Sequence, residues 1–263
     1  ERHYVPHAIN SEHFYRKTDQ EISDLKKQLF GEDDKRVTFF WNNRNARRKM
    51  SGSVLWWFNE FAEEVGPENV RLIMHTEPTD SHGQNLPAML KDLNAEDGRV
   101  QFSTQKMPPD ALASIYNAVD CTINISDAEG FGLATLESLT CGTPIIANMT
   151  GGLQEQVTDG EQFFGVGLRA SSKAVIGSQQ VPYIYEDRVS KEDFIEALRK
   201  VYHMTPAQRS ELGTLGMLHS QKNYNFKSFE KNWVKLMDSI HEKYGSWENR
   251  KIRNDAWKLM EVS

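Results

Sequence analysis

The chain has 263 residues, the length of one large domain or two small ones. Its 31 Lys and Arg against 37 Asp and Glu give a formal net charge of −6, which lacks the basic excess of nucleic-acid-binding proteins. Hydrophobic residues make up 38% and charged residues 26%, which predicts a sizeable core and excludes wholesale disorder. No apolar run approaches the ~20 residues of a transmembrane segment, and no signal-peptide pattern opens the sequence, so we expect a soluble, globular chain.

Short β-rich runs alternate with helical runs from about Arg36 to Ile184. The elements predicted in chain order are a strand at Val37–Trp41, a helix at Val54–Val65, a strand at Val70–Met74, a helix at Leu86–Leu93, a strand at Val100–Ser103, a helix at Pro109–Ala118, a strand at Cys121–Ser126, a helix at Gly132–Cys141, a strand at Pro144–Asn148 and a helix at Gly152–Thr158. Strands separated by helices predict right-handed βαβ units and an α/β, doubly wound parallel (Rossmann-like) sheet.

The remaining segments are predicted as follows. His3–Pro6 is strand-like, and Gly165–Val181, rich in Gly, Ser and Gln, is predicted to be a surface loop. The helical period from Ser190 onward predicts helices at Ser190–Tyr202, Pro206–Ser220 and Phe226–Tyr244, followed by a basic, aromatic tail at Trp247–Met260. Cys121 and Cys141 lie in apolar runs, which favours buried, reduced thiols and a cytoplasmic location.

The segment Glu129–Glu137 follows a buried strand and opens a helix, so we expect it in the crevice beyond the carboxyl ends of the strands. Gly130 and Gly132 let a ligand approach the main chain. The free amides that follow, with the helix dipole behind them, suit a phosphate anion. The alternative is a simple strand-to-helix turn, with Glu129 complementing the helix dipole and Glu137 solvated on the surface.

Glu129 and Glu137 are eight residues apart, which corresponds to about 12 Å along a helix. This separation exceeds the ~5–9.5 Å of paired acids in glycoside hydrolases. We therefore expect the two carboxylates to hold two ends of an extended ligand, with phosphates between them.

A second group of candidate residues follows the first predicted sheet strand, at Asn43–Met50. It contains four cations, Arg44, Arg47, Arg48 and Lys49, in an otherwise acidic chain. Arg offers a planar fork for phosphate oxygens and Lys a compact charge, which indicates a local anion site. A solvated basic loop is the alternative.

The residues from Glu129 to Glu137 resemble the E-x7-E signature of retaining GT-B glycosyltransferases of the large family 4 class. Four further motifs and a linker agree in order and spacing over Tyr4–Glu155, with weaker similarity to about Leu198. Asn43-Arg44 with Lys49 resembles the G-R-x-x-x-x-K-G phosphate loop. The remaining segments are Tyr4–Asn10 with Phe14 (I-P-N-G-V-D-x-x-x-F), Leu112–Asp120 (L-x-x-x-Y-x-x-A-D), Glu137–Ile146 (E-A-M-A-C-G-T-P-V-I) and Gly151–Glu155 (G-G-x-x-E).

This chain departs from the family pattern at several points. His7-Ala8 replaces Asn-Gly, Asn43 and Met50 replace flanking glycines, and Gly165–Val181 resembles an insertion. Such enzymes also have an N-terminal Rossmann domain that holds the acceptor, and the sequence starts at Glu1 without it. The resemblance implies the C-terminal, donor-binding half of a GT-B fold: a nucleotide-sugar-binding domain over residues 1–203 and C-terminal helices over 204–263.

The resemblance also implies roles for specific residues. Arg44 and Lys49 would contact the diphosphate of a nucleotide sugar and stabilise the leaving nucleotide, with Glu129 facing the sugar and Glu137 the ribose hydroxyls. The remaining binding positions that it implies are Gly130, Phe131, Gly132 and Leu133 around the phosphates, and Lys106, Met107 and Pro108 near the base. No cofactor is expected, and no metal, because the sequence has no Asp-x-Asp pair and no His/Cys cluster at ligand spacing.

The expected partners are a nucleotide-sugar donor and an unknown acceptor. In the family the last helix crosses onto the N-terminal domain. We therefore expect an exposed apolar stripe on this helix that packs against that missing domain or against a second copy of the chain. Trp233, Trp247 and Trp257 fall on these C-terminal helices at packing-like spacing.

Three other functions compete. One is a catalytically incomplete nucleotide-sugar-binding module, and another is a GT-B-like nucleotide-sugar epimerase. The third, a Rossmann protein using a nicotinamide cofactor, is disfavoured because no G-x-G-x-x-G follows the first strand.

Overall fold

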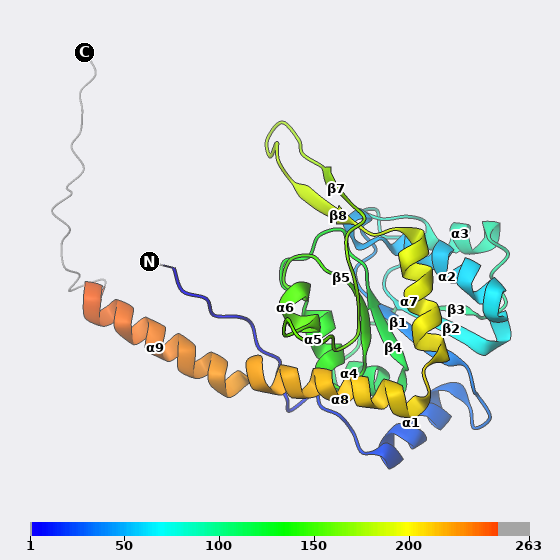
Figure 1. The fold of residues 1–263 in the computed structure, drawn as a ribbon, viewed down its shortest axis with the longest axis horizontal. Coiled ribbons are helices and arrows are strands. Elements are labelled where there is room, and N and C mark those ends of the chain that lie inside the picture. Colours follow the sequence, from blue (N-terminus) through cyan, green and yellow to red (C-terminus); the bar gives the residue numbers. More distant parts are fainter. Residues whose placement is uncertain (1, 247–263) are drawn as a thin grey trace.

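The structure is a computed structural model that describes residues 2–246 (Figure 1). A six-stranded parallel sheet has the strand order β3-β2-β1-β4-β5-β6, and a separate antiparallel pair is formed by β7 and β8. The strands are β1 (Val37–Asn42), β2 (Val70–His75), β3 (Val100–Ser103), β4 (Cys121–Asn124), β5 (Ile145–Asn148), β6 (Val166–Leu168), β7 (Ser172–Val175) and β8 (Tyr185–Arg188). The predicted doubly wound α/β fold is confirmed.

Helices cover both faces of the sheet. They are α1 (Asp19–Phe30), α2 (Ser51–Val65), α3 (Leu86–Asp92), α4 (Pro109–Ala118), α5 (Leu133–Thr140), α6 (Leu153–Val157), α7 (Lys191–His203), α8 (Pro206–Asn223) and α9 (Phe226–Tyr244), with short 3-10 turns at Arg47–Lys49 and Pro67–Asn69. Every helix predicted from the periodicity is present: Pro109–Ala118 and Phe226–Tyr244 have the predicted bounds, and the bounds of the others shift by a few residues.

The central strand β1 shows why the sheet is buried on both sides. Successive side chains of a strand point to opposite faces. Phe39 and Trp41 belong to the core between the sheet and the helices α2 and α7, whereas Phe40 belongs to the core beneath α4 and α5. All three side chains are fully buried, as a strand with helices on both faces requires.

The order of the strands reverses between β1 and β4. The chain moves from β1 outward to β2 and β3, then returns to pair β4 with the other side of β1, at Phe39↔Cys121 and Phe40↔Thr122. In open α/β sheets the loops that leave the carboxyl ends of such a strand pair diverge and leave a crevice for a ligand. Asn43–Met50 follows β1 and Glu129 follows β4, so the two predicted groups of site residues meet there.

Near the N-terminus one prediction is corrected and one unpredicted helix is present. His3–Pro6 forms no strand, and Ile9 makes an isolated bridge with Asn225 instead. Helix α1 was not predicted, although its sequence carries a capping box in which Thr18 and Glu21 bond to each other's backbone. This Thr18-x-x-Glu21 pattern is typical of the start of a helix.

The prediction of a surface loop at Gly165–Val181 is wrong for the two segments that form strands and holds for residues 176–181, which are loop and mostly exposed. Strand β6 extends the sheet by pairing with β5, at Ile146↔Val166, and β7 pairs with β8 in a hairpin that projects from the body of the domain (Figure 1). These strands are only three or four residues long, so local sequence carries little signal for them.

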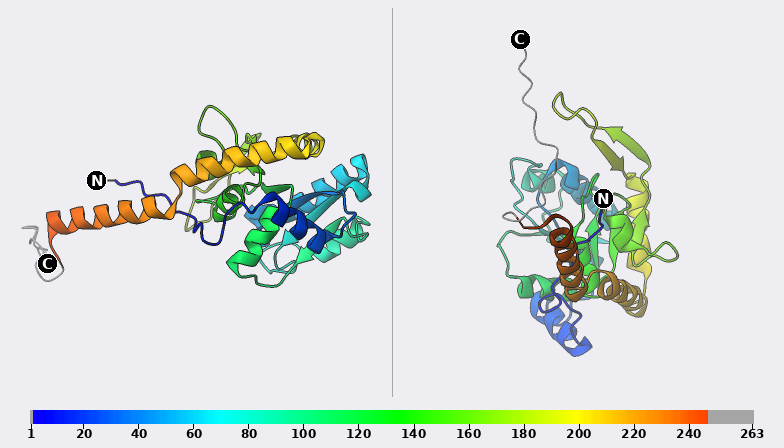
Figure 2. Two further views of the ribbon diagram at one scale, coloured as in Figure 1. Left: turned by 90° about the horizontal axis from the view of Figure 1, so that it is seen from below. Right: turned by 90° about the vertical axis from the view of Figure 1, so that its left-hand side faces the viewer.

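The C-terminal helices continue the chain along one face and beyond it. Helix α8 packs against α5, whereas no residue of α9 is buried, and α9 extends away from the sheet (Figures 1 and 2). Trp233 is half-exposed on α9, while Trp247, Trp257 and the tail to Met260 lie outside the described residues. Within residues 2–246, no helix is both long enough and apolar enough to span a bilayer.

Candidate functional site

Two loops at the carboxyl edge of the sheet are joined to each other. One is the segment Asn43–Met50 after β1, which we call the cationic turn. The other runs from Ile125 to Gly132, between β4 and α5. The amide of Asp127 donates to the carbonyl of Arg48 at 2.8 Å, and Arg48 Nη1 donates to the carbonyl of Ala128 at 2.6 Å.

Lys49 and Glu129 form an ion pair across this junction. Each side chain is only 11% exposed, and Arg48 Nη1 lies 3.9 Å from the same carboxylate. Burial lowers the pKa of Lys49, and its partner Glu129 offsets only part of that effect. The pair is therefore a shielded charge pair at the strand crossover, and it joins the cationic turn to the loop before α5.

Arg44 lies apart from this pair. Its Nε donates to Asp80 at 2.7 Å and its Nη2 lies 2.8 Å from His82 Nδ1, and the side chain is 61% exposed. The Arg44 guanidinium holds the pKa of Asp80 well below its usual range. The structure thus places Arg48 beside Glu129, a position that the sequence motif did not single out.

Glu137 lies on α5 and is not a solvated surface residue. It accepts a hydrogen bond from the hydroxyl of Tyr116 at 2.9 Å, and Asn42 donates to that same hydroxyl at 2.8 Å. Burial raises the pKa of Glu137. No local pattern predicts the contact between Tyr116 and Glu137, because it depends on how α4 packs beside α5.

The start of α5 needs a glycine at position 132. Gly132 precedes the helix with φ +89°, and no side chain caps this end. A Cβ at Gly132 would lie 2.5 Å from Leu153 Cδ2, so only glycine fits without a shift. Phe131 packs its ring against His7, with centroids 4.9 Å apart, while Leu133 is exposed.

The remaining predicted contacts lie in the loop between β3 and α4 and, for Gly130, in the loop before α5. Lys106 and Pro108 are exposed and Met107 is half-buried, just before the first turn of α4. Gly130 is exposed, and its carbonyl accepts a hydrogen bond from the amide of Gly152 at 3.0 Å. Their assigned contacts with a nucleotide remain predictions.

Asp127 is a buried carboxylate that the sequence analysis did not single out. Its side chain is fully buried, and neither of its oxygens accepts a hydrogen bond among the described residues. Arg188 Nη1 lies 3.4 Å from it. Burial raises the pKa of Asp127 to about 6, and the attraction of Arg188 offsets this only in part.

The raised pKa of Asp127 predicts a pH-dependent stability. Because the folded state binds this proton more tightly than the unfolded state, the stabilisation is complete below the ordinary pKa near 3.8 and is lost as the pH rises through about 6. Asp127→Asn is therefore expected to be more stable than the wild type at pH 8 and to lose that advantage at pH 4. Urea unfolding of both proteins at pH 4 and pH 8 measures their free energies of unfolding. The same difference between variant and wild type at the two pH values would contradict this prediction.

Among residues 2–246, no three His, Cys, Asp or Glu side chains are grouped so as to hold a metal ion.

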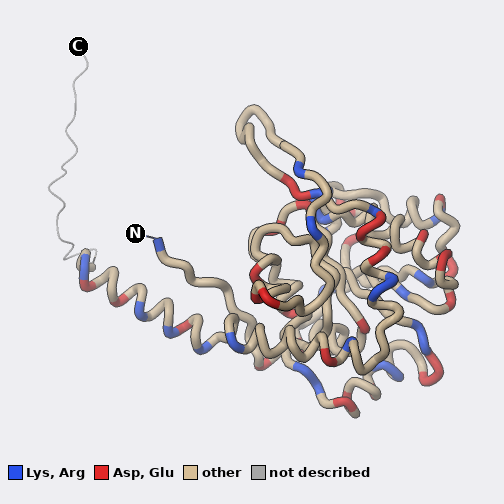
Figure 3. The backbone as a smooth tube through the Cα atoms, in the orientation of Figure 1, with Lys and Arg blue, Asp and Glu red and all other residues tan. Residues whose placement is uncertain are grey.

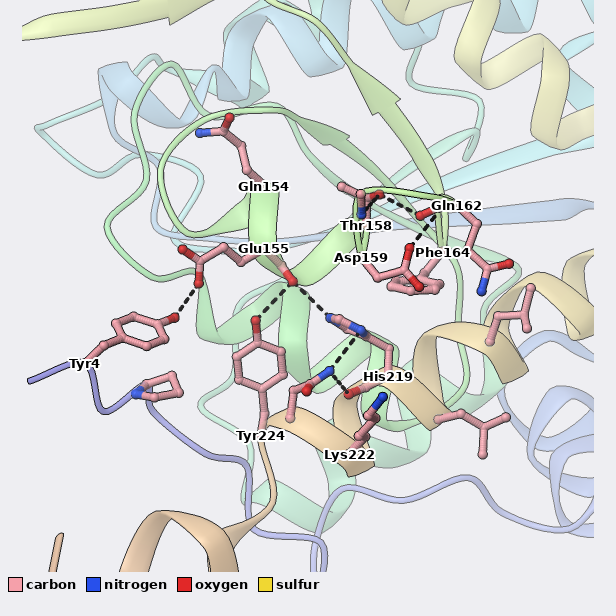
Figure 4. Close-up of a pocket in the computed structure, with 15 residues that line it drawn as sticks. Tyr4, Gln154, Glu155, Thr158, Asp159, Gln162, Phe164, His219, Lys222 and Tyr224 are labelled. Atoms are coloured by element: carbon pink, nitrogen blue, oxygen red, sulfur yellow. Dashed lines mark hydrogen bonds between the residues drawn. The ribbon is translucent and has the colours of Figure 1, made fainter. Parts of the chain in front are cut away.

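A cavity of about 810 Å³ lies away from the strand crossover, between α6, α8 and the N-terminal segment (Figure 4). There Tyr224 and His219 both donate to the backbone carbonyl of Glu155, at 3.0 and 2.9 Å, so these polar groups satisfy one another.

Sequence comparison relates the central part of the chain to glycosyltransferases. Residues 82–210 match the family described as glycosyl transferases group 1. A D-inositol 3-phosphate glycosyltransferase of Acidothermus cellulolyticus is 44% identical over 96 residues, which are 36% of this chain and 19% of that protein. The enzyme of the same name from Arthrobacter sp. is 30% identical over 135 residues, 50% of this chain and 27% of that protein. The chain thus matches about a fifth to a quarter of the length of these relatives.

Structural comparison relates nearly the whole chain to one fold. Sucrose-phosphate synthase from Thermosynechococcus elongatus superimposes with a TM-score of 0.72 at 22% identity, over 91% of this chain and 52% of that one. The C-terminal domain of a glycosyl transferase group 1 family protein from Francisella tularensis gives 0.61 at 16% identity, over 83% of this chain and 99% of that one. Residues 82–210 therefore match the glycosyl transferases group 1 family, and the chain has the fold of the C-terminal half of GT-B proteins.

Proposed function

We propose that this chain supplies the donor-binding half of a retaining glycosyltransferase of the family 4 type, which takes a sugar from a nucleotide-diphosphate sugar. The observation that carries the proposal is the Lys49–Glu129 pair, which joins the cationic turn to the glycine-rich opening of α5 at the strand crossover. A crossover of this kind, with a helix start beside it, favours a ligand that bears phosphate groups.

In this proposal each charged group acts on a different part of the donor. Lys49, with Arg44, stabilises the negative charge that develops on the leaving diphosphate, and the amides of Phe131, Gly132 and Leu133 cradle the phosphates. Glu129 faces the sugar, and Glu137 accepts hydrogen bonds from the ribose. Gly130 leaves room for the donor, and Lys106, Met107 and Pro108 lie beside the base. Because cationic side chains supply the positive charge, we propose that neither a metal nor a cofactor is required.

For the acceptor we propose only where it binds, and not which molecule it is. The matched segments leave most of the relatives' length unaligned, so we propose an acceptor-binding domain outside this chain rather than a named acceptor. The exposed apolar side chains of α9, among them Val234 and Met237, are proposed to pack against that domain or against a second copy of the chain, in the cytoplasm.

Calorimetric titration with UDP, GDP and ADP tests the donor site. We expect one diphosphate to bind the wild type, Glu137→Ala and Arg44→Ala to bind it more weakly, and EDTA to leave the affinity unchanged. Undiminished affinity in both variants would remove the roles assigned to these residues. A requirement for added Mg²⁺ would overturn the metal-independent part.

Product analysis separates this function from the two alternatives. A free or isomerised sugar formed without acceptor would indicate an epimerase. If the chain were only a binding module, the Glu129→Gln variant would bind the nucleotide as tightly as the wild type, and neither protein would transfer sugar. Loss of sugar transfer in Glu129→Gln, measured with the acceptor domain present, is the result that we expect.

A further inference from the structure

The β7–β8 hairpin contacts the proposed donor site, although it belongs to neither of the two sequence motifs that define that site. Its outer part, residues 174–185, contains no charged side chain and is tan in Figure 3. Glu186, Asp187 and Arg188 follow one another at its base, where Arg188 pairs with Ser172. These three residues return the chain from the hairpin to the carboxyl edge of the sheet, where they contact both loops of the site.

Glu186 holds the cationic turn. Its side chain is only 3% exposed, and its carboxylate accepts hydrogen bonds from both terminal nitrogens of Arg47, the Nη1 bond being 2.9 Å long. Arg188 donates to the same carboxylate at 3.1 Å. The hydrogen bonds from Arg47 hold the pKa of Glu186 below its ordinary value, so the carboxylate is charged at neutral pH. Two-pronged bonds of this kind fix orientation as well as distance.

Asp187 holds the opposite loop. Its amide donates to the carbonyl of Asp127 at 2.7 Å, and its side chain accepts from Thr150 at 2.8 Å. Asp127 lies two residues before Glu129, just as Arg47 lies two residues before Lys49. Strand β8 therefore anchors both halves of the Lys49–Glu129 pair, each through a separate contact.

Packing alone does not fix the cationic turn. A cavity of about 380 Å³ borders it, lined by Arg47, Met50 and Arg188 among others. Met50 ends the turn in the left-handed conformation, with φ +59°, which costs a non-glycine residue about 1–2 kcal/mol. Arg48 and Lys49 bond to the opposite loop, and the Glu186 carboxylate adds the side-chain contact that holds Arg47 at the start of the 3-10 turn.

We propose that Glu186 is a positioning residue for the donor site: it holds Arg47, and through the turn it places the ammonium group of Lys49 for the donor's pyrophosphate. This inference rests on the function proposed above. Its consequence is specific, because loss of Glu186 weakens contacts with the second phosphate and leaves those with the nucleoside intact.

Titration of the full chain with a nucleoside diphosphate and the matching monophosphate tests this role. The probe is whichever of UDP, GDP and ADP binds the wild type. Glu186→Gln is expected to bind the diphosphate about tenfold more weakly and the monophosphate with nearly unchanged affinity. Arg47→Ala, which removes an exposed side chain, is expected to give the same tenfold loss and covers the case in which Glu186→Gln fails to fold. Tyr183→Ser, on the exposed outer part of the same hairpin, serves as the matched control and is expected to change neither affinity.

The double variant Arg47→Ala/Glu186→Gln distinguishes positioning from a general loss of structure. If Glu186 acts through Arg47, the double variant binds as tightly as Arg47→Ala alone, because the two changes remove one interaction. Additive losses, or equal losses for both nucleotides, would overturn the positioning role while leaving the donor site in place. Failure of all three diphosphates to bind the wild type would overturn the proposed function, and this inference with it.

Discussion

Lys49→Ala is expected to weaken binding of the nucleoside diphosphate about 30-fold, which corresponds to about 2 kcal/mol for one shielded, charge-assisted contact. Lys49 is nearly buried and adjoins Glu129, so solvent screens its field less than that of a surface lysine. Arg44→Ala is expected to cost no more than about fivefold, because its exposed guanidinium is already paired with Asp80. Calorimetric titration of both variants with the nucleoside diphosphate shows which substitution causes the larger loss of affinity.

Lys49→Ala also leaves the Glu129 carboxylate without its partner, so its effect on binding has to be separated from an effect on folding. Lys49→Met/Glu129→Gln removes both charges and is expected to recover stability without recovering affinity. Lys27→Ala, an exposed lysine on α1, is the control for loss of a positive charge far from the site. A larger loss of affinity in Arg44→Ala than in Lys49→Ala would contradict the proposed site.

Gly151→Ala is expected to lower the free energy of unfolding by about 3 kcal/mol, and the melting temperature by roughly 6–12 °C. Gly151 has φ +49°, and a Cβ there would lie 1.7 Å from the carbonyl oxygen of Glu129. Relief of this clash requires the backbone that carries Glu129 to move. The variant is therefore expected to lose diphosphate affinity even where it remains folded, as thermal unfolding and calorimetry will show.

Gly160→Ala is the matched control for Gly151→Ala. Its φ is +95°, but no atom lies within 4 Å of the added Cβ, so only backbone strain of about 1 kcal/mol is expected, with no effect on binding. Equal destabilisation by the two substitutions would show that the contact with Glu129 contributes nothing. Unchanged nucleotide affinity in a folded Gly151→Ala protein would separate this glycine from the site.

Local pattern determined the sheet strands and helices from β1 to α6 and the three helices that follow. Val54, Trp57, Phe58 and Phe61 recur at helical spacing, and that spacing alone predicts one buried face, which α2 presents to the sheet. The Asn43–Met50 and Glu129–Glu137 segments were also recognisable, because each directly follows a buried strand and carries charges or glycines that a plain turn does not need.

Tertiary structure decided which of those charges act together. The motif pointed to Arg44 and Lys49 alike, yet Asp80 and His82, from the segment between β2 and α3, draw Arg44 away, and the crossover leaves Lys49 beside Glu129. Tyr116 reaches Glu137 only because α4 packs on α5, and Glu186 reaches Arg47 across 139 residues of sequence. Periodicity reports which face of an element is buried, whereas ion pairs between loops depend on strand order and register, which no local window of sequence contains.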